Sequence, residues 1–117
     1  MTVSLHLIYF NLLTEPPKID TMNAVEYDVI EGMSLVLQFK VHGYPYPSVT
    51  LRHNEEIVLN ETKMDVIYID HNVSKLDDGG YTLTAENPFG NASSTIKVKV
   101  IGEYFALIDR VSERAID

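Results

Sequence analysis

The chain contains no cysteine and no tryptophan, and its basic residues are few. Disulfides are the usual guide to an oxidising compartment, so without cysteine the sequence does not indicate which redox compartment the protein occupies. Nine Lys and Arg residues against 17 Asp and Glu give a net charge of −8, and the basic residues do not cluster. Such a chain repels phosphate backbones, so we expect no nucleic-acid partner. Two interpretations of the negative charge stay open. The acidic side chains form an ordinary solvated surface, or they attract a basic protein partner.

Long apolar runs are also missing. No stretch reaches the ~18 residues of a membrane helix, so we expect no membrane contact within this chain. The apolar start, "MTVSLHLIYFNLL", lacks a basic n-region and a small-residue cleavage site. We interpret residues 1–16 as an N-terminal strand or leader, with a clipped signal peptide as the alternative.

Residues 3–10 alternate in a way that suits a strand, with Val3, Leu5 and Leu7 on one face and Ile8 and Phe10 on the other. Pro16 and Pro17 are expected to break any continuing strand. A short apolar strand before such a hinge can pair with a sheet edge of its own copy or of a neighbour, which would give a strand-swapped homodimer. The alternative is a disordered leader.

The rest of the chain alternates with period two, which predicts strands. The residues expected to face inward are Leu35, Leu37, Phe39, Val41, Val49, Leu51, Ile67, Ile69, Tyr81, Leu83, Ala85, Ile96, Val98 and Val100. Residues 57–62 read as a short edge strand, and "NEE" and "NPFGN" read as turns. About seven short strands separated by turns predict one all-β, antiparallel β-sandwich over residues 17–101. Residues 102–117 are expected to form a linker or a short helix.

The stretch "DDGGYTL" has the spacing of a tyrosine corner, with Asp77, Gly79 and Tyr81 at alternate positions. In a β-sandwich such a tyrosine bonds back to upstream backbone and stabilises a crossover between the sheets. Together with Ala85, Asn87, Gly90 and the upstream "GYPYPSV", the pattern resembles the I-set immunoglobulin domain. The resemblance implies an immunoglobulin-like sandwich that lacks its inter-sheet disulfide.

In that family the inter-sheet disulfide joins the positions of Phe39 and Leu83, and the core tryptophan occupies the position of Leu51. All three are apolar here. A disulfide between positions 39 and 83 would stabilise the fold by about 4 kcal/mol. Burial of the Phe39 and Leu83 side chains stabilises it by roughly 1.5–3 kcal/mol each. Packing can therefore replace the cross-link.

The runs "GYTL", "ENPFG" and "VLNET" resemble the membrane-proximal domain of Trk-type neurotrophin receptor tyrosine kinases. That domain also has apolar inter-sheet positions. The present chain departs from it in lacking a surface disulfide and the tryptophan, and in a shorter segment between Thr62 and Asp77.

Enzymatic chemistry has no support in the sequence, so we expect no catalytic activity, metal or cofactor. His6, His42, His53 and His71 lack metal-ligand spacing, although His42 and His53 could approach each other across a hairpin. The adjacent Asp77 and Asp78 are typical of a turn rather than of an acid/base pair.

Three sequons, at Asn60, Asn72 and Asn91, satisfy Asn-x-Ser/Thr. They favour a secreted or cell-surface glycoprotein with its membrane anchor outside this chain. The alternative is coincidence in an intracellular protein.

The first function hypothesis is an extracellular domain of a receptor tyrosine kinase-like protein that binds a growth factor. The Trk resemblance implies a basic, dimeric cystine-knot ligand and a contact surface of loops at one end of the sandwich. The candidate turns are residues 42–46, 75–78 and 87–89. Within them the candidate ligand-binding residues are Tyr44, Lys75, Leu76, Asp77, Asp78 and Phe89. The alternatives are a structural module of a titin- or twitchin-like sarcomeric protein and a homophilic cell-adhesion domain.

Overall fold

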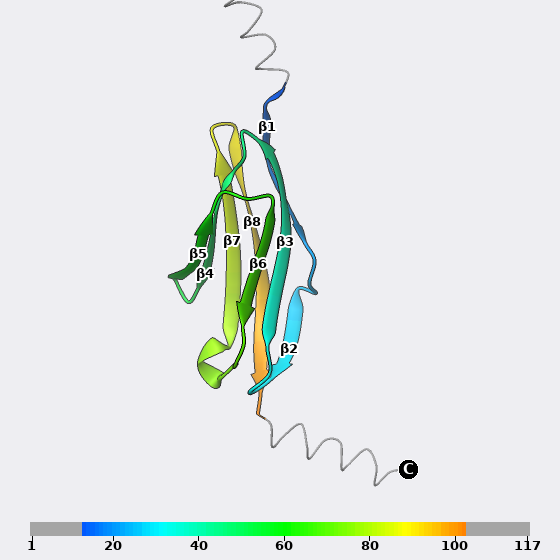
Figure 1. Ribbon diagram of the computed structural model, residues 1–117, viewed down its shortest axis with the longest axis vertical. Coiled ribbons are helices and arrows are strands. Elements are labelled where there is room, and N and C mark those ends of the chain that lie inside the picture. Colours follow the sequence, from blue (N-terminus) through cyan, green and yellow to red (C-terminus); the bar gives the residue numbers. More distant parts are fainter. Residues whose placement is uncertain (1–12, 103–117) are drawn as a thin grey trace, which may run out of the picture.

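A computed structural model describes residues 13–102 of the chain (Figure 1). The elements, in order, are β1 (Glu15–Thr21), β2 (Glu26–Ile30), β3 (Leu35–Tyr44), β4 (Ser48–His53), β5 (Glu56–Glu61), β6 (Asp65–Asp70), the 3-10 helix η1 (Lys75–Asp77), β7 (Gly79–Asn87) and β8 (Gly90–Ile101). The predictions for residues 3–10 and 103–117 lie outside the described residues.

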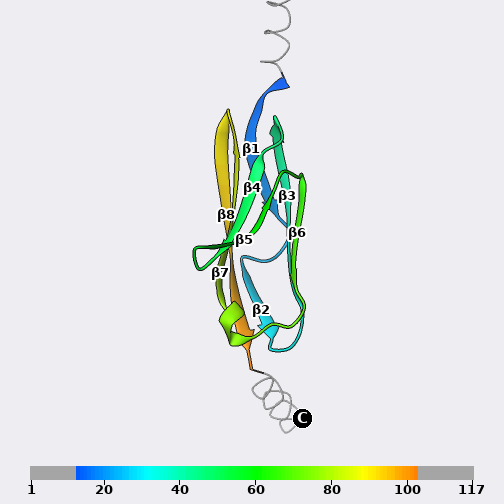
Figure 2. The same ribbon diagram turned by 60° about the vertical axis from the view of Figure 1, so that its left-hand side comes forward.

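The strands form two layers, as expected (Figure 2). One sheet has the order β1-β3-β6 and the other has the order β2-β8-β7-β4-β5. The predicted all-β sandwich is therefore confirmed. The expectation of purely antiparallel pairing is wrong at one place, because β2 pairs parallel to β8. Residues 22–25 join β1 to β2 while the chain keeps its direction and changes sheets, so β2 meets β8 parallel (Figure 1).

The core lies between the two sheets and is formed by alternate residues of the strands. In β3 the side chains of Leu35, Leu37, Phe39 and Val41 are buried, while the residues between them point outward. The same alternation holds in β4, β7 and β8. Among the described residues no polar or charged side chain is buried. Apolar packing between the sheets is thus the main source of stability.

The predicted inward face of β6 is wrong. Ile67 and Ile69 are exposed, whereas Val66 is fully buried and Tyr68 packs against the core. Residues 66–69 are all apolar or aromatic, so period two alone does not tell which parity faces inward. Pairing decides it, because Val66 lies opposite the buried Phe39 and partners across a ladder share a face.

Two prolines lie within β1, near its start, and whether they interrupt a strand from residues 3–10 lies outside the described residues. β1 includes both Pro16 and Pro17, and its register against β3 shifts between Glu15 and Lys18. A proline has no N–H to donate to a neighbouring strand. An edge strand with an irregular register tolerates this, because some of its backbone positions make no ladder hydrogen bond. β1 lies at the edge of its sheet, which is where prolines are tolerated.

Candidate protein-recognition surfaces

The connection from β6 to β7 is built around Tyr81. Its side chain is fully buried, and its hydroxyl donates a hydrogen bond of 2.7 Å to the backbone oxygen of Asp77. The His53 ring stacks on the Tyr81 ring, with centroids 4.2 Å apart and planes inclined by 6°. Burial, followed by the nearby Tyr68 and the acidic residues of this corner, raises the pKa of Tyr81 well above its usual range. The phenol therefore stays protonated, and keeps donating its bond, to a higher pH than an ordinary tyrosine would.

Most of the polar side chains in this turn serve the fold. Asp77 accepts a 2.8 Å bond from the Ser74 N–H and completes a capping box on η1. Asp78 accepts a 2.7 Å bond from the Val100 N–H, and the Lys75 ammonium donates a 3.0 Å bond to the Val100 oxygen. These contacts attach the turn to β8. Leu76, in contrast, is 86% exposed.

The opposite end of the sandwich is organised by Asn87. Its Nδ2 donates to the backbone oxygens of Glu15, at 2.8 Å, and Pro45, at 3.0 Å. Its Oδ1 accepts a 2.9 Å bond from the Phe89 N–H. One side chain thus joins the start of β1, the β3–β4 turn and the β7–β8 turn. The β3–β4 turn also contains a cis Tyr44–Pro45 peptide bond.

Three aromatic rings are exposed on these joined turns. Tyr44, Tyr46 and Phe89 are 44%, 61% and 41% exposed, and the rings of Tyr44 and Tyr46 pack edge to face with centroids 6.1 Å apart. We call this group, Tyr44, Tyr46 and Phe89, the aromatic end. Its geometry depends on a tight backbone: Gly43 has a φ of +146°, and a Cβ added there would lie 2.9 Å from Pro47 Cγ.

The six predicted ligand-binding residues do not form one surface. Tyr44 and Phe89 lie at the end where Ser48 pairs with Glu86 and Asn87 with Gly90. Lys75, Leu76, Asp77 and Asp78 lie beyond the other end of β7, where Gly79 pairs with Val98. Figure 1 shows the β7–β8 turn and η1 at opposite ends of the molecule. The expectation of one contiguous loop end is therefore wrong, since the β6–β7 turn and the two hairpin turns occur at opposite strand termini.

Two residues at this end lie within the predicted turns, but their roles there were not predicted. Tyr46 lies between Pro45 and Pro47, and its ring is exposed. Asn87 was included only as a residue of the turn at 87–89. Its three bonds join segments that are far apart in sequence, so no local signal indicated them.

The residues predicted at the centre of the core are buried, and the predicted glycosylation sites are exposed. Phe39, Leu51, Tyr81 and Leu83 are all fully buried, with Leu51 directly opposite Leu83 in the pairing of β4 with β7. The sequon residues are exposed: Asn60 near the end of β5, Asn72 in the bend after β6 and Asn91 at the start of β8.

The histidines do not assemble into a site. His42, on β3, lies 2.9 Å from the Asp20 carboxylate, whereas His53, on β4, contacts the backbone oxygen of Asp78 at 2.8 Å. The possible approach of His42 to His53 is thus not realised, because they belong to different sheets. In residues 13–102 no group of three or more His, Asp or Glu residues could hold a metal ion. Nor does that part of the chain contain a helix long and apolar enough to cross a membrane.

Curated relatives are similar over most of this chain. Human immunoglobulin superfamily member 10 is 30% identical over 103 residues, which is 80% of this chain and 4% of that protein. Rat neural cell adhesion molecule L1 is 33% identical over 78 residues, covering 61% of the chain and 6% of the relative. The zebrafish (Danio rerio) striated muscle preferentially expressed protein kinase is 30% identical over 99 residues, covering 77% of the chain and 3% of the kinase. The chain thus spans a small part of each relative.

Solved structures share the fold. A chimeric titin Z1Z2 has a TM-score of 0.66 at 22% identity, covering 77% of this chain and 98% of that one. A chain of the complex of titin M10 with an obscurin-like 1 Ig domain has a TM-score of 0.65 at 20% identity, covering 74% and 95%. These relatives and structures do not confirm the resemblance to Trk-type receptors.

Family membership follows from the sequence and the fold together. The sequence model of the immunoglobulin I-set domain matches residues 17–100. The match includes the tyrosine corner, whose bond from Tyr81 to Asp77 is present, and both sheets of the sandwich. Immunoglobulin domains with this fold are generally non-catalytic and mediate protein–protein contacts. The chain belongs to the immunoglobulin I-set family.

Proposed function

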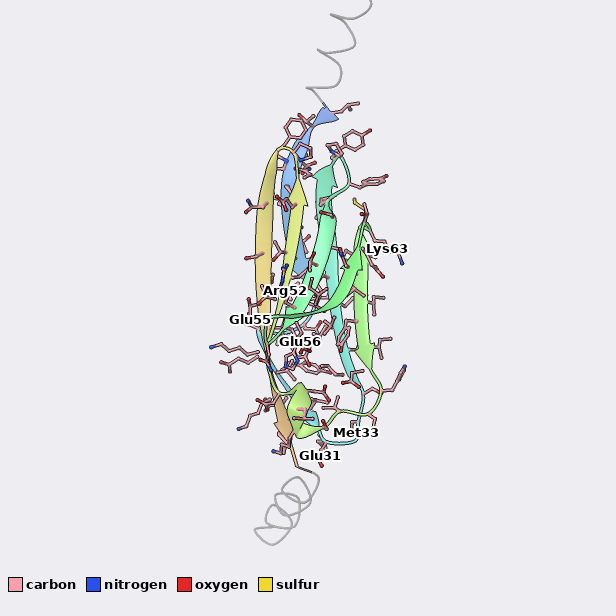
Figure 3. All side chains as sticks on the ribbon, turned by 90° about the vertical axis from the view of Figure 1, so that its left-hand side faces the viewer. Glu31, Met33, Arg52, Glu55, Glu56 and Lys63 are labelled. Carbon is pink, nitrogen blue, oxygen red and sulfur yellow. The ribbon has the colours of Figure 1, made fainter. Side chains whose placement is uncertain are left out.

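We propose that this chain is a protein-recognition domain of a multidomain cell-surface protein, and that the aromatic end contacts the partner. The observation that carries the proposal is the exposure of Tyr44, Tyr46 and Phe89 on two turns that Asn87 joins. Aromatic side chains are enriched at binding hot spots, because a rigid ring buries a large area at a low entropic cost. Figure 3 shows side-chain rings at the end of the sandwich where β1 begins.

The proposed partner is a basic protein growth factor of the cystine-knot class, as the Trk resemblance implies. A net charge of −8 supports a basic partner, and Glu15 and Glu86 are exposed near the aromatic end. Charge complementarity of this kind mainly increases the association rate, which falls as salt screens the attraction. Ring contacts would supply the remaining affinity and would not weaken with salt.

The two ends of the sandwich provide a matched test. Tyr46→Ala and Phe89→Ala remove exposed rings from the aromatic end, while Leu76→Ala removes an exposed apolar side chain from the opposite end. Binding to a purified basic neurotrophin is measured by surface plasmon resonance at low and physiological salt. We expect at least a tenfold loss of affinity, about 1.4 kcal/mol, for the aromatic variants and none for Leu76→Ala. Loss with Leu76→Ala alone would move the contact to η1, and no binding by the parent would exclude this ligand class.

Glycosylation tests the cell-surface location. When the chain is secreted from animal cells, we expect a mobility shift on glycosidase treatment, and a stepwise loss of that shift as Asn60, Asn72 and Asn91 are each replaced by Gln. All three sequon residues are exposed, which allows a glycan to be attached. A shift that is absent in the parent would contradict the proposal.

A structural module of a titin-like intracellular protein is the second candidate. The observation that favours it is the absence of cysteine together with apolar packing at Phe39 and Leu83. A domain that needs no disulfide folds equally well in a reducing compartment. Expression in the cytosol without glycans, with the same stability as the secreted protein, suits this candidate. Self-association through the aromatic end would instead support homophilic adhesion.

A further inference from the structure

The outer edge of β6 is an open sheet edge. The three-stranded sheet ends at β6, and among residues 13–102 no strand pairs with its outer side. In immunoglobulin sandwiches this sheet has four strands, the last of which comes between the equivalents of β5 and β6. Here residues 62–64 connect β5 to β6 directly, so the described chain has no such strand.

The backbone of β6 presents unused hydrogen-bonding groups at this edge. The Val41 N–H donates a 2.7 Å bond to the Met64 oxygen, so the pair of residues 41 and 64 is a hydrogen-bonded one. Such pairs alternate along an antiparallel ladder, and the register continues as Phe39 with Val66 and Leu37 with Tyr68. Asp65, Ile67 and Ile69 therefore point their N–H and C=O groups away from β3.

Apolar side chains lie on both faces of the sheet next to this edge. On the outer face, Ile67 and Ile69 are 49% and 46% exposed, and Val36 lies directly opposite Ile69. On the inner face, Tyr68 is only partly buried. On β5, the neighbouring edge of the other sheet, Val58 and Leu59 are also partly buried against the core. An added strand would gain apolar contacts on both of its faces.

We propose that residues 3–10 of this chain pair as a strand with the outer edge of β6. These residues lie outside the described part of the structure. Their sequence is apolar on both faces, with Leu5 and Leu7 on one and Ile8 and Phe10 on the other. A strand with one face in water needs only one apolar face. A strand beside β6 would contact apolar side chains on both faces, which suits a segment that is apolar on both. Eight extended residues span about 26 Å, more than the length of the six-residue β6.

Strand direction also fits. Glu15 pairs with Tyr44, and β6 begins at Asp65, opposite Lys40, and ends at Asp70, opposite Leu35. β6 therefore runs away from the end at which the preceding chain joins β1. A segment of the same copy that leads toward Glu15 would run antiparallel to β6, which is the more stable pairing, and an exchanged segment that takes the same place would keep this direction.

Chain length favours a second copy as the source of the segment. From β1 to the open edge, a chain must cross β3 and β6, about three strand spacings or 14 Å. The chain from Phe10 to Glu15 spans about 17 Å when fully extended. Residues 3–10 of the same copy could therefore reach the outer edge of β6 only if this connection were almost fully extended. Exchange between two copies removes that limit. Asp65 and Asp70 flank β6, and such charges restrict indiscriminate pairing of an edge.

Hydrogen exchange on the full chain tests the pairing. We expect the Ile67 and Ile69 amides to exchange about tenfold more slowly, or more, in the parent than in Leu7→Asp, because these amides face the new strand. The Val66 and Tyr68 amides, which bond β3, are the internal reference. Thr2→Asp adds the same charge outside residues 3–10 and is expected to match the parent. Unprotected Ile67 and Ile69 amides in the parent at every protein concentration would overturn the proposal, as would equal protection in Leu7→Asp.

Cross-linking identifies the source of the segment. The chain has no cysteine, so Ile67→Cys can be combined with a cysteine placed in turn at each of residues 3–10 without background. Ile67 is exposed, so this change leaves the core intact. We expect bridges at positions of one parity only, because alternate residues point to opposite faces. We expect bridges between two chains, and bridges found only within one chain would overturn the assignment of the segment to a second copy. No bridge from any position, or bridges at both parities, would contradict the pairing.

Discussion

Replacement of Leu83 by alanine tests whether apolar packing replaces the missing cross-link. Leu83 lies in the centre of β7, fully buried, opposite Leu51 on β4 and Ser94 on β8. Phe39 belongs to the facing sheet and to the same buried cluster. Truncation to alanine removes three carbons from the layer between the sheets. The hydrogen-bonded neighbours on both sides of β7 keep the strands in place, so the site cannot close around the cavity.

The cost consists of the lost burial of the removed carbons and the cavity that remains. For a fully buried leucine this sum is about 2–5 kcal/mol. A domain of this size has roughly 5–15 kcal/mol of stability in all, so the change removes a substantial fraction of it. Each kcal/mol lowers the Tm by roughly 4–8 °C in a domain of this length. We therefore expect a Tm lower by about 8 °C or more.

Urea unfolding, followed by far-ultraviolet circular dichroism, measures the free energy of unfolding of parent and variant. We expect a lower midpoint with an unchanged dependence on urea. Leu76→Ala is the matched control, because it makes the same chemical change at a residue that is 86% exposed, and such changes stay within about 0.5 kcal/mol. A loss below about 1 kcal/mol for Leu83→Ala would refute the argument that packing at this position replaces a disulfide.

Three further predictions concern the same core and corner. Tyr81→Phe removes the bond to the Asp77 oxygen and should lower the free energy of unfolding by about 0.5–1.5 kcal/mol, and a variant as stable as the parent in urea would show that the corner bond contributes nothing. Phe39→Cys combined with Leu83→Cys should form a disulfide in air, seen as loss of free thiol; a thiol count that stays at two would indicate a sheet spacing that does not suit a bridge. Because burial raises the pKa of Tyr81, its contribution to stability is complete below about pH 10, the usual pKa of an unfolded tyrosine, and is lost as the pH rises above that value; a parent whose alkaline unfolding is no steeper than that of Tyr81→Phe would contradict this linkage.

The sequence by itself determined the fold class and most of the core. Alternation in β3, β7 and β8 assigned the inward residues, because one parity in each strand is predominantly apolar and the other predominantly polar. Spacing alone also indicated the corner at Tyr81, since the bond to Asp77 joins residues four apart in the chain. Local patterns of this kind record local geometry, so they can be read without the rest of the molecule.

Tertiary structure decided everything that depends on which strands meet. The parity of β6 was set by pairing with β3, because residues 66–69 are apolar on both faces and carry no local signal. Assignment of Tyr44 and Phe89 to one end, and of Leu76 to the other, required the order of the strands. The bonds of Asn87 to Glu15 and Pro45 join residues 72 and 42 positions apart. Contacts at such separations depend on how the two sheets close on each other, and alternation along a single strand holds no information about that closure.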